Sequence, residues 1–299
     1  MTYPTTKTVD HVDTYHGVAV PDPYRWLEDD TSPETAAWVE AQNAVTFAHL
    51  DTIPFRPALT RRLEQLFNYP KFSAPERRGS TYFFSKNDGL QNQAVIYTQQ
   101  GLDGAPAVLL DPNTLSPDGT TKLSVFSVSA NGRLAVYGLS QGGSDWMEYR
   151  VLDVATRQPR EDVVQWVKVS GAAWAGDGFF YSRYPAPTGG KDLSAKNVNH
   201  EVYFHKVGTP QAADEKVFSD PANPERFHTV EVTEDERFLI LTVSDRGKGK
   251  KGNAVFYRDL ASKDPAFTPI VGEIGDDTFT VVDNIGATFL VYTDRKAPN

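Results

Sequence analysis

A pair of turn residues followed by a short apolar or aromatic run recurs five times along this chain. Glycine, asparagine and aspartate suit such turns because a tight hairpin needs residues with positive φ. Spacing of about 50 residues, with room for about four strands in each unit, is typical of the blades of a β-propeller. The pairs are Arg78-Gly79, Asn131-Gly132, Asp177-Gly178, Asp235-Glu236 and Ile285-Gly286.

Further apolar runs over residues 149–154, 202–207 and 255–260 supply additional strands. The fifth unit has room for only about one strand before Asn299, which leaves about four blades and a stub. Because a propeller protects its sheet edges by closing into a ring, such a stub would leave an open strand edge. We therefore expect an incomplete propeller, in a chain that is truncated relative to its gene or is one half of a split protein.

The first 70 or so residues predict a helical arm instead. Residues 22–30 suggest an extended segment that ends in an acidic turn. Ser32 is a good N-cap for a helix that continues to about His49. A second helix should begin near Pro57 and stop before Pro70, since the residue before a proline disfavours the α conformation. Two helices alone cannot bury their apolar stripes, so we expect them to pack on another part of the protein.

Charge and composition exclude several kinds of partner and site. The net charge of −9 disfavours binding to phosphate backbones, so no nucleic-acid partner is expected. The local basic cluster over residues 246–251 is interpreted as a solvated loop tip. The chain has no cysteine, which excludes disulfides and cysteine-zinc sites. Neither a signal peptide nor an apolar stretch of about 18 residues is visible, so we expect a cytoplasmic protein without a membrane segment.

The segment Gly138-Leu139-Ser140-Gln141-Gly142 fits the G-x-S-x-G pattern of a hydrolase nucleophile. That pattern has catalytic meaning only between a strand and a helix, whereas Ser140 follows one predicted strand and precedes another. We interpret the segment as a turn between strands. A small, self-sufficient hydrolase that uses Ser140 is the enzymatic alternative.

Histidines and carboxylates give no metal or cofactor site. His200 and His205 lie five residues apart on a predicted strand, so their side chains should point to opposite faces and form packed or solvated imidazoles. The run Glu28-Asp29-Asp30 is interpreted as a charged surface turn. We therefore expect no catalytic residue, no metal and no cofactor in this chain.

Several segments, in family order along nearly the whole chain, resemble the N-terminal part of the prolyl oligopeptidase family of serine peptidases. They are Tyr15-His16-Gly17, Asp22-Pro23-Tyr24-Arg25-Trp26-Leu27-Glu28, Val39-Glu40-Ala41-Gln42-Asn43, Asn68-Tyr69-Pro70-Lys71, Gly89-Leu90-Gln91-Asn92-Gln93, Asp111-Pro112-Asn113 and Gly143-Ser144-Asp145-Trp146.

The resemblance implies an endopeptidase that cleaves short peptides after proline. In this family a seven-bladed propeller caps an α/β-hydrolase domain that is mostly C-terminal. Residues 1–71 would be the helical arm of the hydrolase domain, and residues 72–299 the first four blades with the start of a fifth. The catalytic triad would then lie in the C-terminal half, which becomes the partner of this chain, and proline-containing peptides become its substrates.

Three residues carry over from the family as substrate-gating or substrate-binding candidates. Asp145 matches an acidic propeller residue near the substrate cavity that can pair with an arginine of the hydrolase domain; a turn-stabilising aspartate is the alternative. Val169 stands where some relatives carry a phenylalanine in an outer subsite. Arg246 lies near the place where relatives offer an arginine to the peptide backbone. A free-standing propeller of four or five blades, acting as a binding module, is the non-enzymatic alternative for the whole chain.

Overall fold

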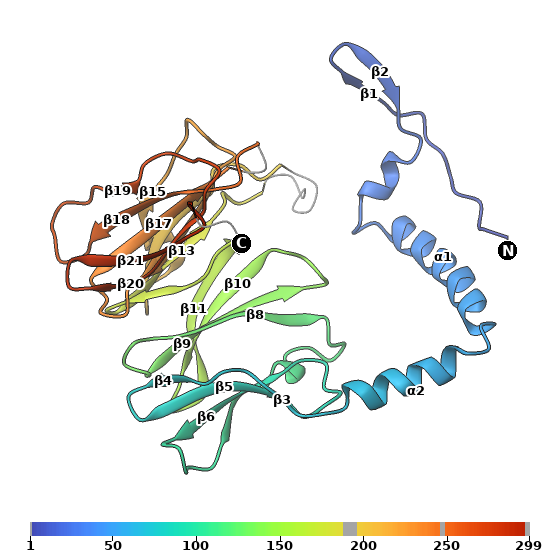
Figure 1. Ribbon diagram of the computed structural model, residues 1–299. Helices are drawn as coiled ribbons and strands as arrows, with labels where there is room; N and C mark the ends of the chain where they lie inside the picture. The colour runs from blue at the N-terminus through green and yellow to red at the C-terminus, as the bar shows by residue number, and fades with distance from the viewer. Residues whose placement is uncertain (1, 188–195, 246–248, 297–299) are drawn as a thin grey trace. The chain divides into compact units, whose positions relative to one another are not determined.

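The computed structural model describes residues 2–187, 196–245 and 249–296 (Figure 1). The chain divides into two compact units, residues 1–69 and residues 70–299, and each is described by itself. The first unit holds a β-hairpin and the α-helices, and the second is built almost entirely from β-strands. This division agrees with the change from a helical to a β pattern in the sequence.

The first unit begins with a hairpin that was not predicted. Strand β1 (Val12–Tyr15) pairs antiparallel with β2 (Val18–Pro21). The two linking residues, His16 and Gly17, have φ values of 51° and 81°. Positive φ at both positions is the geometry that joins two twisted strands through two residues. The sequence signal was therefore the His-Gly pair between short apolar runs.

The expected extended segment over residues 22–30 is wrong in its middle. Residues Arg25–Glu28 form the 3-10 helix η1. Arg25 forms ion pairs with Asp22, Glu28 and, from the hairpin, Asp13. The pairs with Asp22 and Glu28 are local, three residues away on either side, whereas Asp13 is twelve residues away, so the last pair is one that a local reading of the sequence does not reveal.

Both predicted helices are confirmed. Helix α1 (Pro33–Asp51) begins at Ser32, whose Oγ accepts hydrogen bonds from the backbone N–H groups of Glu34 and Thr35 at 3.1 and 3.4 Å. Such an N-cap satisfies N–H groups that have no partner within the helix. Helix α2 (Arg56–Phe67) ends before Pro70, as the sequence predicts.

The apolar stripe of α2 stays open to solvent. Leu59, Leu63 and Leu66 are 51%, 45% and 50% exposed. The sequence analysis predicts that these leucines pack against another part of the protein. Their exposure within this unit is consistent with that expectation. Among the helices of the described residues, none is long and apolar enough to cross a membrane.

The second unit consists of antiparallel sheets that follow one another along the chain. Within the described residues there are four four-stranded meanders and a final hairpin, and a short strand, β3 (Lys71–Phe72), also pairs with β5. The strands of the first two meanders are β4 (Glu76–Arg78), β5 (Thr81–Asn87), β6 (Val95–Gln100), β7 (Ala107–Leu110), β8 (Thr121–Val128), β9 (Leu134–Gln141), β10 (Met147–Asp153) and β11 (Gln158–Val167). The remaining strands are β12 (Ala173–Ala175), β13 (Gly178–Arg183), β14 (Glu201–Lys206), β15 (Glu215–Phe218), β16 (Phe227–Val232), β17 (Phe238–Ser244), β18 (Ala254–Asp259), β19 (Thr268–Val271), β20 (Phe279–Ile285) and β21 (Thr288–Thr293).

The repeat predicted from the sequence matches this arrangement. Each predicted turn pair lies at the turn between the first and second strands of its unit, and the runs at 149–154, 202–207 and 255–260 contain the third strands β10, β14 and β18. The last unit holds two strands rather than about one, because β20 precedes its turn. The mainly-β class is therefore confirmed.

Most of the predicted turns use positive φ at their second residue, as at Gly79 and Glu236, with φ values of 59° and 55°. The third unit differs, because the positive φ of 55° belongs to Gly176. Gly178 instead opens β13, where an added Cβ would lie 2.2 Å from the carbonyl oxygen of His205. Glycine is needed there for a close approach between strands rather than for the turn.

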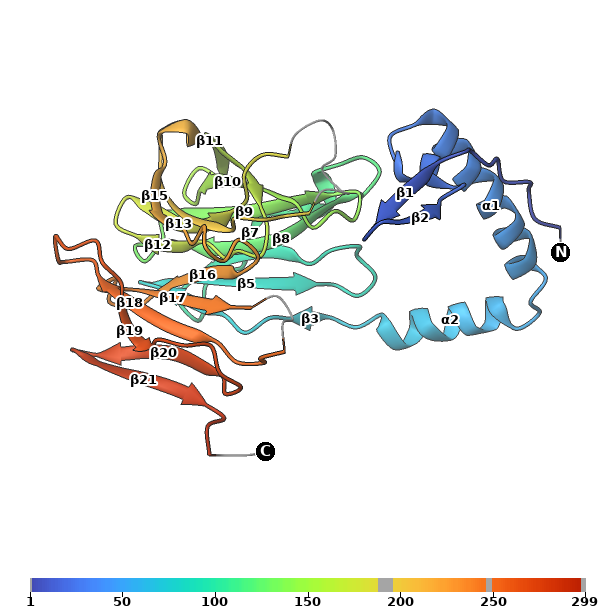
Figure 2. The same ribbon diagram turned by 90° about the horizontal axis from the view of Figure 1, so that it is seen from above.

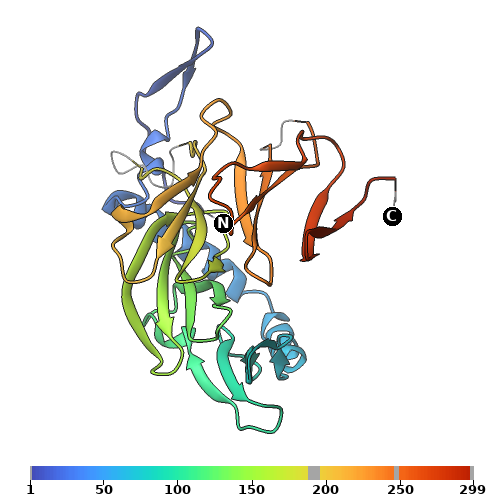
Figure 3. The ribbon, with the colours of Figure 1, turned by 90° about the vertical axis from the view of Figure 1, so that its left-hand side faces the viewer.

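Successive sheets pack face to face through apolar side chains. Between the second and third meanders, for example, Tyr149 and Val151 meet Phe179 and Tyr181, and all four are almost fully buried. Similar clusters join the first meander to the second, the third to the fourth, and the fourth to the final hairpin. The sheets thus follow one another in an arc (Figures 2 and 3).

Candidate functional site

One end of the second unit gathers the predicted site residues. In an antiparallel meander the link from the second to the third strand and the link from the fourth strand to the next sheet lie at the same end. We call this the connecting end; it includes residues 142–146, 168–172 and 219–226. Asp145 and Val169 both lie in its links. Arg246 belongs to the link between β17 and β18 and lies outside the described residues.

Asp145 is held by a lysine that the sequence did not single out. The Asp145 side chain is 69% exposed, and its Oδ1 lies 2.7 Å from Nζ of Lys168, whose side chain is only 12% exposed. The same ammonium lies 4.7 Å from the ring centre of Trp146. The structure thus places Asp145 beside the residue that precedes Val169. No local pattern marks Lys168, because its partners come from another strand link.

Val169 is distinguished by its backbone. It is 43% exposed and has a φ of 53°. A β-branched side chain disfavours this left-handed region, which costs about 1–3 kcal/mol and persists only where the surroundings impose it. Val169 is therefore displayed to solvent in a conformation that its neighbours must enforce.

Another arginine, Arg226, lies beside Asp245, the last described residue before Arg246 in the sequence. The carboxylate of Asp245 accepts a hydrogen bond of 2.9 Å from Nε of Arg226. Nη1 of the same arginine lies 3.5 Å from Oδ2 of Asp220. Arg226 and Asp245 line two cavities of about 290 and 470 Å³ at the connecting end. Arg226 was not predicted, since nothing in the sequence pairs it with the link after β17.

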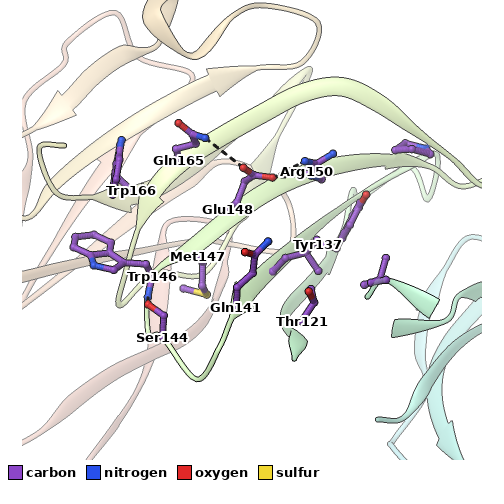
Figure 4. Close-up of a pocket in the computed structure, with 13 residues that line it drawn as sticks. Thr121, Tyr137, Gln141, Ser144, Trp146, Met147, Glu148, Arg150, Gln165 and Trp166 are labelled. Atoms are coloured by element: carbon purple, nitrogen blue, oxygen red, sulfur yellow. Dashed lines mark hydrogen bonds and ion pairs between the residues drawn. The ribbon is translucent and has the colours of Figure 1, made fainter. Parts of the chain in front are cut away.

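Aromatic rings form a layer beside Asp145. The ring of Trp146 makes edge contacts with Trp166 and Tyr184 at centroid distances of 5.6 and 6.1 Å. Trp146 and Trp166 also line a cavity of about 590 Å³ (Figure 4). Glu148 and Arg150 line it as well and form an ion pair of 2.7 Å with each other. The cavity therefore combines aromatic faces with charges that neutralise one another.

Both histidines are packed, which is one of the two predicted environments, but His200 precedes β14 rather than lying on the strand as predicted. His200 and His205 are both fully buried. His205 lies between two carboxylates, with Nδ1 2.8 Å from Asp214 and Nε2 3.1 Å from Asp162. Burial alone would lower the pKa of His205, but the hydrogen bonds and charges of the two aspartates outweigh it and raise the pKa above its ordinary value.

His200 supports the connecting end from below. Its Nε2 hydrogen bonds to the carbonyl of Lys168 at 2.9 Å, and its Nδ1 accepts a 2.9 Å bond from the backbone N–H of His228. The acceptor role of Nδ1 leaves the ring proton on Nε2. Burial lowers the pKa of His228, which favours the neutral form there too.

Ser140 has no nucleophile geometry. It lies within strand β9 rather than in the predicted turn, which begins two residues later at Gly142. Its side chain is buried and its Oγ lies 2.9 Å from Oγ of Ser124. Strand β10, not a helix, follows. No group of three or more potential metal ligands is found in the part of the chain that the structure describes.

The first strands of the sheets line an open axial hollow of about 730 Å³, with residues from β4, β8, β12, β16 and β20. Its lining is rich in carboxylates. Some of these are engaged within the protein, since Glu76 pairs with Arg78, and Glu236 accepts a 3.2 Å hydrogen bond from the N–H of Gly176. The charged lining residues are Glu76, Arg78, Glu231, Glu234, Glu236 and Asp283.

Comparison with known proteins identifies the class to which this fold belongs. Residues 3–299 match the family described as "Prolyl oligopeptidase, N-terminal beta-propeller domain". The chain therefore belongs to this family, which confirms both the propeller and the resemblance found in the sequence.

Individual relatives are prolyl endopeptidases. The chain is 43% identical over 298 residues to the prolyl endopeptidase of Elizabethkingia meningoseptica, a match that covers 99% of this chain and 41% of the relative. The match to the prolyl endopeptidase of Elizabethkingia miricola is 42% identical, with the same coverage. The chain thus spans about two fifths of the length of these relatives.

A solved structure of similar fold is prolyl oligopeptidase B from Galerina marginata, bound to a 25mer macrocyclization substrate. It superposes with a TM-score of 0.81 at 29% identity and covers 99% of this chain and 45% of that one. A structure from a study of two prolyl endopeptidases gives a TM-score of 0.69 at 35% identity, with 99% and 42% coverage.

Proposed function

We propose that this chain is the propeller-bearing portion of a proline-specific serine endopeptidase that cleaves short peptides after proline. The observation that carries the proposal is the match of nearly the whole chain to prolyl endopeptidases that are more than twice as long. The remaining length of such a protein would supply the α/β-hydrolase domain with its serine, histidine and aspartate. The 299-residue chain alone would then be inactive.

The division of labour within the chain follows from this assignment. Residues 1–71 belong with the hydrolase domain, and residues 72–299 provide four blades and the start of a fifth in a seven-bladed ring. The exposed leucines of α2 support the assignment of residues 1–71, because covering such an apolar stripe with another domain is energetically favourable.

The propeller would act on substrate access. Among the described residues, the first strands of the sheets line a hollow of about 730 Å³. A flexible peptide can enter such a space, whereas a folded protein is too wide. Peptides are also bound by the Galerina marginata relative. We assign substrate gating or binding to Asp145 and Val169, at the connecting end, and to Arg246, which lies outside the described residues.

In the complete enzyme the reaction is acyl transfer. A serine activated by a histidine attacks the carbonyl carbon of the proline residue, and hydrogen-bond donors stabilise the tetrahedral oxyanion. The C–N bond then breaks, and the amine of the following residue leaves with the proton held by the histidine. Water, activated by the same histidine, hydrolyses the acyl-enzyme and frees the serine. The propeller contributes by excluding bulk water and large substrates from the site.

The test compares the 299-residue chain with the complete gene product on a chromogenic proline-amide substrate. We expect turnover, blocked by a serine-directed inhibitor, only from the complete protein. The Ser140→Ala variant of that protein should keep its activity, because Ser140 is buried in β9. Turnover by the 299-residue chain that disappears in Ser140→Ala would instead support a self-sufficient hydrolase.

A further inference from the structure

The strand link that carries Val169 is anchored on both sides by buried groups. The carbonyl of Lys168 accepts a hydrogen bond from His200, and the carbonyl of Ser170 accepts one from the hydroxyl of Tyr149 at 2.7 Å. The N–H of Ser182 donates to Oγ of Ser170 at 2.8 Å. His200, Tyr149 and Ser182 are each fully buried. The backbone around Val169 is therefore fixed from below by the core of the third meander and its neighbour.

The solvent side of this link is held mainly by one side chain. Lys168 lies between the carboxylate of Asp145 and the face of Trp146, at 2.7 Å and 4.7 Å. Because its side chain is only 12% exposed, the ion pair is less screened than one between two exposed groups. The ring of Trp146 adds an attraction for the same ammonium.

The turn that bears Asp145 is closed by backbone hydrogen bonds, from the N–H of Ser144 to Gln141 and from the N–H of Gly142 to Thr120, but its glycines face open space. It contains Gly142 and Gly143, both with positive φ, at 58° and 79°. An added Cβ at either glycine would meet nothing within 4 Å, so no close packing confines them. Lys168 is thus a tie from the well-anchored link of Val169 to the glycine turn of Asp145.

We propose that Lys168 is a positioning residue for peptide binding at the connecting end. Its ammonium fixes the glycine turn against the 168–172 link, so that Asp145 and Val169 form one surface of constant shape. A peptide long enough to reach this surface binds more tightly when the surface is ordered beforehand, because the protein then loses less conformational entropy on binding. The inference rests on the proposed function, since it requires that a peptide reaches this end.

The test uses the complete gene product and two substrates, a short proline-amide and a peptide of about eight residues. Lys168→Met keeps the length and apolar stem of the side chain and removes its charge, whereas Lys168→Arg keeps the charge. The matched control is Lys206→Met, which removes an ion pair of similar length, 2.8 Å, with Asp177 between two exposed side chains at the opposite end of the strands.

For Lys168→Met we expect KM for the longer peptide to rise about fivefold to tenfold, as the loss of a partly buried ion pair and a cation–π contact predicts. The kcat on the short substrate should stay within about twofold. Lys168→Arg should restore KM, and Lys206→Met should change neither substrate. Asp145→Asn, at an exposed position, should reproduce the KM effect, and the double variant should add little to it.

The outcomes separate this inference from the function on which it rests. If the unsubstituted protein does not cleave after proline, the proposed function fails. If it does cleave, and Lys168→Met affects both substrates equally or neither, Lys168 is not a positioning residue. The same conclusion follows if Asp145→Asn leaves KM for the longer peptide unchanged, a result that does not depend on the folding of the lysine variant.

Discussion

His205 offers a direct test of how the third meander is held together. Both of its ring nitrogens face a carboxylate, Asp214 at 2.8 Å and Asp162 at 3.1 Å. A neutral imidazole has only one N–H, so only the imidazolium can donate a hydrogen bond to both carboxyl groups. The pKa of His205 is raised accordingly, although its burial acts in the opposite direction. The raised pKa favours a positive charge on His205 between the two carboxyl groups.

The substitution His205→Gln removes the ionisable imidazole and leaves the two aspartates in place. The side chains of Asp162 and Asp214 are 2% and 1% exposed. Removing one partner of a buried ion pair costs about 3–5 kcal/mol. The hydroxyl of Tyr181 still donates to Asp214 at 2.7 Å and offsets part of the loss. We therefore expect the free energy of unfolding to fall by about 3 kcal/mol near neutral pH.

The pH dependence follows from the direction of the pKa shift. In the unfolded chain His205 titrates near its ordinary pKa of 6.5, and in the folded chain it titrates above that value. The stabilisation is fully present below pH 6.5 and is lost as pH rises through the folded pKa. Between the two values the unfolding free energy should fall by up to about 1.4 kcal/mol per pH unit, because the folded state binds one more proton. The glutamine variant should lack this slope.

The assay is urea unfolding of the 299-residue chain, followed by tryptophan fluorescence at about pH 6 and about pH 9. Comparing each variant with the unsubstituted chain at the same pH cancels the titration of the other histidines. His49→Gln, at an exposed position on α1, is the matched control and should leave stability unchanged. The reasoning is refuted if His205→Gln costs less than about 1 kcal/mol at pH 6, or if its cost does not shrink at pH 9.

Two further substitutions test local features of each unit. Gly178→Ala should lower the free energy of unfolding by at least about 2 kcal/mol, because the added Cβ would lie 2.2 Å from the carbonyl oxygen of His205. Gly171→Ala is the control. Its added Cβ would meet nothing within 4 Å, so it should be neutral in the same urea assay. Ser32→Ala should cost about 1 kcal/mol of helix stability, because the helix loses its N-cap. The loss is measured as reduced helical circular dichroism at 222 nm in a thermal scan. Ser262→Ala, in a surface loop, is the control and should leave this signal unchanged.

The sequence predicted the parts of the fold that depend on local chemistry. Ser32 predicts the start of α1, and pairs that contain glycine or asparagine predict the hairpin turns, because capping and positive φ are properties of one or two residues. Gly178 shows the limit of this reading. The sequence pattern predicts a turn residue at this position, yet the role of the glycine depends on the carbonyl of His205 on the next strand.

The candidate site was predictable only where it resembles the family. Asp145 and Val169 were found through that resemblance, and the structure adds that they are neighbours through Lys168. Lys168 and Arg226 were missed because their partners lie in other strand links, 23 and 19 residues away in sequence for Asp145 and Asp245 respectively. Nothing in a linear pattern distinguishes such residues from the other basic residues of the chain.

The buried polar groups of the third meander explain why the connecting end can have a defined shape. Apolar contacts between sheets are non-directional and fix the separation of the sheets better than their register. Directional bonds supply the register: His205 bonds to Asp162 of β11, and His200 bonds to the carbonyl of Lys168 and to His228 of β16. The third meander is thereby fixed to both neighbours. The links that carry Asp145 and Val169 inherit that register, so the surface offered to a peptide is set by hydrogen bonds in the core beneath it.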